Sequence, residues 1–219
     1  MQNTLSPERR SLRLRMARGF TKPVVVPAAL LFGTLLTILL ALVQAVQIPL
    51  GALPEDSLRL AAVPVWHFMH VLGGATFGIL GPIQFGRVLA RRFGRLHRVM
   101  GRVFVAAGAM ISLSSLGLLW RFPDTYSVAM NSGRLLFGIA LGVALAIAMQ
   151  AIRKRDFTRH RNWMIRAYAI GIGATAVTMV FFPIYVITGE PPMGLVADVV
   201  FLGSWAACVV FAEGLVRRI

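Results

Sequence analysis

The chain has 219 residues, of which 57% are apolar and 14% are charged, and its mean hydropathy is +0.73. Soluble domains carry about 25% charged residues, so this composition excludes a water-soluble globular protein. The formal net charge of +15 would suit a partner of nucleic acid. We expect no nucleic-acid partner, because the basic residues are distributed along the chain as a membrane protein requires.

Six apolar stretches are each long enough to cross a hydrocarbon core about 30 Å thick. They lie at residues 24–46, 64–86, 99–120, 132–152, 163–187 and 195–216. The segments between them are too short to hold a folded domain. The sequence therefore predicts an all-α fold, a six-span transmembrane helical bundle that forms a single domain over residues 24–219. A basic segment, residues 1–23, precedes it and is expected to be a helix on the membrane surface or a basic tail.

The basic residues indicate the orientation of the bundle. Twenty of the 23 Lys and Arg residues lie before the first span, around the loops after the second and fourth spans, or after the sixth span. Cytoplasmic loops carry an excess of Lys and Arg, so both termini are expected in the cytoplasm. We expect the inner membrane of a bacterial cell, with lipids and anionic headgroups at the cytoplasmic face as partners.

The histidines are the candidate ligands for a cofactor. The single cysteine, Cys208, lies in the last predicted span, so a disulfide or thiolate cluster within the chain is excluded. His70 lies about 10 Å inside the second span at a rise of about 1.5 Å per residue. An ionisable group at that depth indicates a functional site, and we expect His70 to matter more than His67, one turn nearer the surface.

An internal repeat relates the other two histidines. The matching residues are Gln84, Arg87, His97, Arg98 and Arg102 in residues 64–120, and Gln150, Arg153, His160, Arg161 and Arg166 in residues 132–187. The two halves share one orientation, which predicts a parallel repeat of helix pairs, with spans two to five forming a four-helix core. His97 and His160 are then expected to converge on one cytoplasmic-side site lined by Arg102 and Arg166.

Three stretches resemble an uncharacterised bacterial membrane family, domain of unknown function 2306. They are HVLGGATFGILGPIQF (70–85), LHRVMGRVFV (96–105) and RDFTRHRNWMIRAYAI (155–170). The resemblance continues from Trp205 to Glu213 and covers about residues 64–215. It implies a six-span fold and no established reaction. The chain differs from the family at Cys208, where asparagine is common, and near Met179, where arginine is common.

One hypothesis is a redox membrane protein linked to haem or quinone. In diheme membrane cytochromes, facing helices supply imidazoles to the haem iron. His97 and His160 would ligate the iron of a b-type haem, and Arg102 and Arg166 would pair with its propionates. His70 is a further candidate for binding a cofactor, although the fourth span offers no histidine to pair with it. Such a protein would work with a redox partner or as a homodimer.

Other hypotheses use the same residues. A cationic pocket at the inner leaflet would bind lipid phosphates or other anions without a redox cofactor. Asp156, four residues before His160, would allow a zinc site with His97. A small transporter is less favoured, because the middle of the membrane holds no carboxylate. Glu213 is expected to pair with Arg217, one helical turn away.

Overall fold

The computed structural model describes the backbone of residues 7–53 and 55–218, and the side chains of residues 28–53, 58, 60–86 and 89–218. Every regular element in this part of the chain is helical, as predicted. The elements are α1 (Pro7–Leu50), the 3-10 helix η1 (Glu55–Ala62), α2 (Pro64–Gln84), α3 (Arg87–Arg92), α4 (Gly94–Arg121), α5 (Val128–Arg153), α6 (Phe157–Gly171), α7 (Gly173–Thr188) and α8 (Gly194–Val216).

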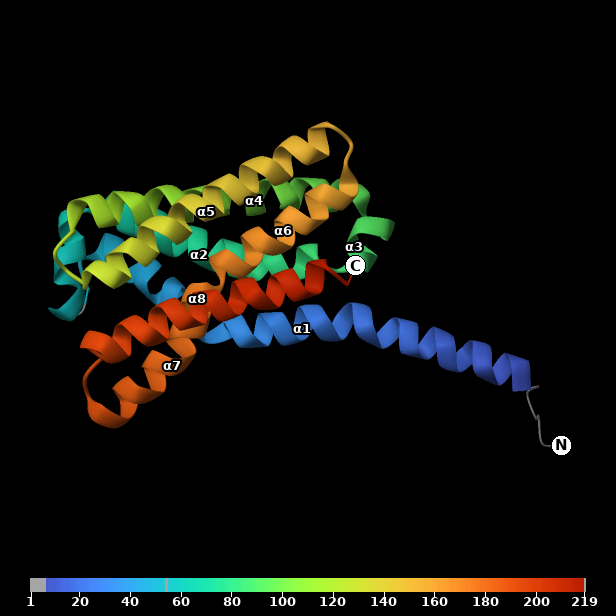
Figure 1. The fold of residues 1–219 in the computed structure, drawn as a ribbon, viewed down its shortest axis with the longest axis horizontal. Helices are drawn as coiled ribbons and strands as arrows, with labels where there is room; N and C mark the ends of the chain where they lie inside the picture. Colours follow the sequence, from blue (N-terminus) through green and yellow to red (C-terminus); the bar gives the residue numbers. More distant parts are fainter. Residues whose placement is uncertain (1–6, 54, 219) are drawn as a thin grey trace.

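Five helical segments are long and apolar enough to cross a membrane. They are Ala28–Leu50, Gly94–Arg121, Val128–Arg153, Phe157–Thr188 and Gly194–Val216, which overlap five of the six predicted spans. The remaining predicted span, 64–86, forms α2, a helix of 21 residues that includes His67 and His70. This helix is about 31 Å long at about 1.5 Å per residue. It packs between α1 and α4 and runs between the same two ends of the bundle as they do (Figure 1).

Successive spans run in opposite directions along the bundle, so the basic segments gather at one end (Figure 1). We call it the arginine-rich end: α2, α5 and α8 end there, and α4 and α6 begin there. Its exposed arginines are Arg91, Arg92, Arg95, Arg98, Arg102, Arg153, Arg155, Arg159, Arg161, Arg217 and Arg218. The helix α1 begins at Pro7, projects past this end and continues unbroken into the first predicted span, while residues 1–6 lie outside the described part.

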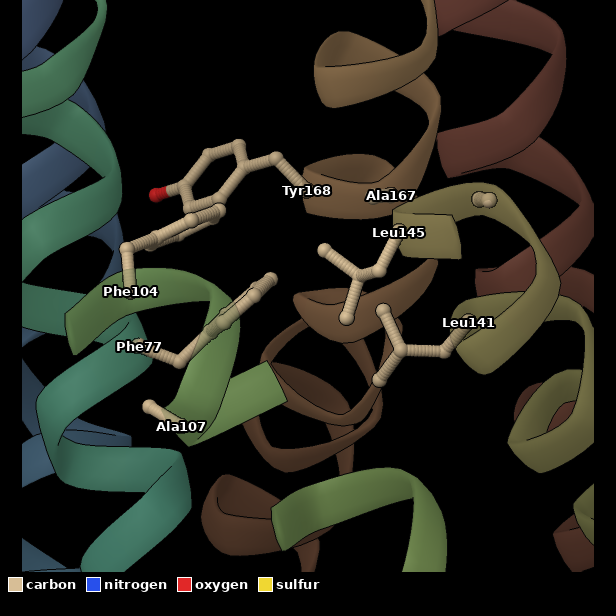
Figure 2. Close-up of a cluster of buried hydrophobic side chains, with 8 residues drawn as sticks. Phe77, Phe104, Ala107, Leu141, Leu145, Ala167 and Tyr168 are labelled. Carbon is tan, nitrogen blue, oxygen red and sulfur yellow. The ribbon is translucent and has the colours of Figure 1, made fainter. Parts of the chain in front are cut away.

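The main core is built from α2, α4, α5 and α6 (Figure 2). Its buried side chains are Phe77, Phe104, Ala107, Leu141, Ala144, Leu145, Ala167 and Tyr168. Phe77 stacks on Phe104 with ring centroids 4.2 Å apart, and the ring of Tyr168 meets that of Phe85 edge-on at 5.1 Å. These four helices contain predicted spans two to four and the first part of predicted span five. The parallel repeat that relates the two halves stays a prediction.

The predicted fifth span, 163–187, consists of two helices that are separated at Ile172. Glycines flank the break, and large rings fill the space that their missing side chains leave. Phe77 packs on Gly171, and Trp205 of α8 packs on Gly173. The indole Nε1 of Trp205 also donates a hydrogen bond to the carbonyl oxygen of Ile170 at 2.8 Å. Glycines permit such bends in a helix. At this bend, Trp205 of α8 packs against the end of α6.

Candidate functional site

The ring of His97 is held at the arginine-rich end by Gln84. Two backbone groups fix the orientation of the Gln84 amide: its oxygen accepts from the Gly101 N–H (3.2 Å), and its nitrogen donates to the His97 carbonyl oxygen (3.3 Å). In this orientation the same nitrogen donates to His97 Nδ1 at 2.9 Å. Because Nδ1 accepts, the neutral His97 ring carries its proton on Nε2.

The ring of His160 has the opposite arrangement. Its Nδ1 lies 2.9 Å from the carbonyl oxygen of Ala148, which can only accept. The proton is therefore on Nδ1, and Nε2 keeps its lone pair. His160 and His97 lie close enough to interact electrostatically. The repeat-related Gln150 is exposed, so the two halves fix their histidines differently.

The haem or metal site stays a prediction, and the hydrogen bonds in this structure do not leave a free lone pair on both rings. A coordinating imidazole nitrogen needs a free lone pair. His160 Nε2 has one, but in His97 the Nδ1 lone pair is used by Gln84 and Nε2 is protonated. Asp156 is also engaged, because its Oδ1 accepts from the Arg159 N–H at 2.9 Å and caps α6. Within the part of the chain that the structure describes, no three His, Cys, Asp or Glu side chains form a metal-binding group.

The two predicted site arginines lie in different surroundings. Arg102 is exposed on α4. Arg166 of α6 forms a bidentate ion pair with Glu213 of α8, with Nε–Oε1 at 2.5 Å and Nη2–Oε2 at 2.9 Å. The predicted pairing of Glu213 with Arg217 is therefore corrected, because α8 packs along α6 and brings a planar guanidinium to the carboxylate. This pairing balances the charge of Arg166, and its predicted role with haem propionates stays a prediction.

The ion pair lines a cavity between α5, α6 and α8. The cavity has a volume of about 170 Å³. Its other lining residues are apolar, and several are small: Ala140, Val143, Ala144, Trp163, Ile170, Val209 and Ala212. The guanidinium carbon of Arg166 lies 4.9 Å from the ring centre of Trp163, a cation–π contact. The cavity thus combines apolar walls, an aromatic ring and one charged pair.

The charged pair retains hydrogen-bonding capacity beyond its two mutual contacts. A guanidinium has five N–H groups, and the contacts with Glu213 use two of the five on Arg166. A carboxylate has about four lone-pair positions, so Glu213 can also accept further hydrogen bonds. A ligand with a flat apolar body and one or two polar oxygens matches this combination.

The two histidines of α2 connect helices at the other end of the bundle. His67 Nε2 lies 3.3 Å from Gln44 Oε1 of α1, and His70 Nδ1 lies 3.1 Å from Ser114 Oγ of α4. The Ser114 hydroxyl donates to the Ile111 carbonyl oxygen, so it accepts from His70. His67 is the more buried of the two, at 4% exposed. His70 lies in the first half of α2, whereas Gln84 ends this helix beside His97. His70 is therefore not part of the same site as His97 and His160.

Sequence reasoning missed the Arg166–Glu213 pair, although a signal was present. Both residues are ionisable, carry opposite charges and lie inside two different predicted spans. Ionisable residues within spans usually pair with each other inside the bundle. Applied between predicted spans, that rule favours the pairing of Glu213 with Arg166 over its pairing with Arg217, one turn away.

A family model described as "Predicted membrane protein (DUF2306)" matches residues 67–216, which is most of the chain. The resemblance seen in the sequence is thereby confirmed. Neither a curated protein nor a solved structure matches the chain.

Proposed function

We propose that this chain, which belongs to the DUF2306 family of predicted membrane proteins, binds the head group of a membrane quinone in the cavity between α5, α6 and α8. The chain is an integral multi-pass membrane protein. Its finer topology is part of the proposal: six spans in a bacterial inner membrane, with both termini and the arginine-rich end in the cytoplasm.

The observation that carries the proposal is the Arg166–Glu213 pair beside Trp163 on an otherwise apolar wall. Ionisable residues within membrane spans are rare and energetically costly, which makes this partly exposed pair a candidate functional group. A quinone head group is a flat ring with carbonyl oxygens. The free N–H groups of Arg166 would donate to one carbonyl oxygen, while the alanines of α5 would contact the ring.

The chemistry of Glu213 suits the reduced form of the same ligand. A quinol carries hydroxyl groups, and a carboxylate oxygen of Glu213 would accept a hydrogen bond from one of them. A redox role also needs a partner protein that exchanges electrons with the bound quinone. Quinone binding in this cavity does not require His97 or His160, because neither lines it. His97 is hydrogen-bonded to Gln84, and His160 to the carbonyl oxygen of Ala148.

Fluorescence quenching tests the proposal. Quinones quench tryptophan, so titration of the full-length protein in detergent with a short-chain ubiquinone or menaquinone analogue should give a saturable signal that W163F reduces. W120F is the matched control, because Trp120 is 82% exposed and does not line the cavity.

A second variant pair tests the place of binding. A140F fills the cavity and should abolish saturable quenching. A146F adds the same ring at an exposed position of α5 and should leave it unchanged. Thermal unfolding and size-exclusion profiles establish that both variants are folded. Quenching that is linear with concentration, or equal in the two variants, would refute quinone binding in this cavity.

A further inference from the structure

An open cleft of about 510 Å³ lies at the corner between α3 and α4, at the arginine-rich end. Its lining residues are Arg92, Phe93, Gly94, Arg95, Leu96 and Val99. We propose that this cleft binds one anionic phospholipid, with the phosphate at the arginines and the glycerol backbone and upper acyl chains on the apolar residues. The cleft shares no lining residue with the quinone cavity, so this proposal does not depend on quinone binding.

The charge of the cleft favours an anion. Arg92 and Arg95 are exposed, and Arg98 Nη1 lies 3.6 Å from the position that a Cβ atom on Gly94 would take. None of the residues lining the cleft is acidic, and the sequence contains no acidic residue between Asp56 and Asp124. A phosphate would therefore meet several guanidinium groups, which form strong bidentate hydrogen bonds with phosphate oxygens.

The apolar half of the cleft favours a lipid over a free phosphate ion. Phe93, Leu96 and Val99 are large apolar side chains, and each is about half exposed (51%, 49% and 50%). The guanidinium carbon of Arg92 lies 5.8 Å from the ring centre of Phe93, so charge and apolar surface adjoin. A free ion would leave the apolar surface uncovered, whereas a lipid would cover both halves.

The position of the cleft matches the depth of lipid phosphates. The apolar segment Gly94–Arg121 begins in the cleft and continues into the bundle. Figure 1 shows the short helix α3 at the end of the bundle, joining the end of α2 to the start of α4. Basic pockets at the cytoplasmic side of membrane helices bind anionic headgroups. Acyl chains would follow α4 from Val99 toward the hydrocarbon core.

Native mass spectrometry of the full-length protein tests this site. The protein is exchanged into detergent containing phosphatidylglycerol or phosphatidylcholine, and the retained lipid is counted. We expect selective retention of one phosphatidylglycerol molecule, weakened about 30-fold in R92Q/R95Q. R92K/R95K keeps the charge and should retain most of the binding. R153Q/R155Q removes the same charge from exposed positions after the fourth predicted span and should bind as the wild type does.

Each other outcome would overturn the proposal. Equal loss in R92Q/R95Q and R153Q/R155Q would show attraction to the whole basic face, with no site in the cleft. Unchanged retention in R92Q/R95Q would exclude the cleft. Displacement of the lipid by millimolar inorganic phosphate would show that the cleft recognises a free anion. Retention of phosphatidylcholine to the same extent would exclude recognition of the lipid's net charge.

Discussion

Tyr168 of α6 lies directly on Gly81 of α2, so closely that a Cβ atom at Gly81 would overlap the tyrosine ring. The ring also packs against Phe77 and Phe85, with centroid distances of 5.8 Å and 5.1 Å. Since Tyr168 is only 4% exposed and belongs to the main core, it has little room to move. The absence of a side chain at Gly81 therefore permits the contact between α2 and α6.

Gly81→Ala should destabilise the protein, because the methyl group forces the Tyr168 ring out of a packed core. Overpacking of this kind costs about 1–3 kcal/mol. Gly74→Ala in the same helix is the control, because no atom lies within 4 Å of the position of its added Cβ. Thermal unfolding in detergent should show a lower Tm for the first variant only. Equal effects of both substitutions would argue against the tight contact. The double variant Gly81→Ala/Tyr168→Leu should recover part of the lost stability, because the smaller side chain makes room for the methyl group.

The Arg166–Glu213 pair should be energetically coupled. Arg166→Gln or Glu213→Gln alone leaves one charge without its partner. The side chains are 25% and 37% exposed, so we expect a modest cost of about 1–2 kcal/mol for each single variant. The double variant should cost less than the sum, with a coupling of about 1 kcal/mol. Arg217→Gln is the control and should have little effect; a coupling between Arg217 and Glu213 of equal size would contradict the observed pairing.

The two histidines at the arginine-rich end should be opposite tautomers. Nitrogen-15 NMR of histidine-labelled protein at a pH where both rings are neutral should show His97 protonated on Nε2 and His160 protonated on Nδ1. Gln84→Leu should abolish the preference of His97, because its Nδ1 loses the donor. Gln150→Leu should leave both signals unchanged, since Gln150 is exposed. A lone pair on Nε2 of both rings would instead support the hypothesis that His97 and His160 ligate a haem iron.

Purified protein should show no haem absorption. The lone pair that His97 would offer to iron is used by Gln84, and Arg166 is neutralised by Glu213. A difference spectrum between reduced and oxidised samples should therefore be featureless, and added haemin should bind without saturation. Stoichiometric haem that is lost in His97→Ala but kept in Arg218→Ala, a control at an exposed position outside the predicted site, would contradict this expectation.

The helices were predictable because composition alone determines most of them. A run of about 20 apolar residues has few alternatives to a helix in a membrane, since backbone polar groups must be satisfied within the segment. The break at Ile172 was missed because both flanking glycines also suit ordinary close packing of membrane helices. Their effect depends on Phe77 and Trp205, which approach from other helices.

The candidate site was less predictable, because it depends on contacts between distant segments. The repeat included both Gln84 and His97 but did not predict their contact, and the proton position of His97 follows from the backbone groups of His97 and Gly101. The spacing rule for ion pairs favours a partner one turn away for Glu213. The observed partner, Arg166, is 47 residues away and reaches it through helix packing.

The contacts between α6 and α8 also constrain the order of events during biosynthesis. Chains fold from the N-terminus as they are made, yet Glu213, the partner of Arg166, follows it by 47 residues. The indole of Trp205, which binds the Ile170 carbonyl, also comes later in the chain. The first five predicted spans must therefore stay in the membrane with an uncompensated arginine until Glu213 has been synthesised. A nascent chain arrested before Glu213 should be recognised by quality-control proteases as incomplete.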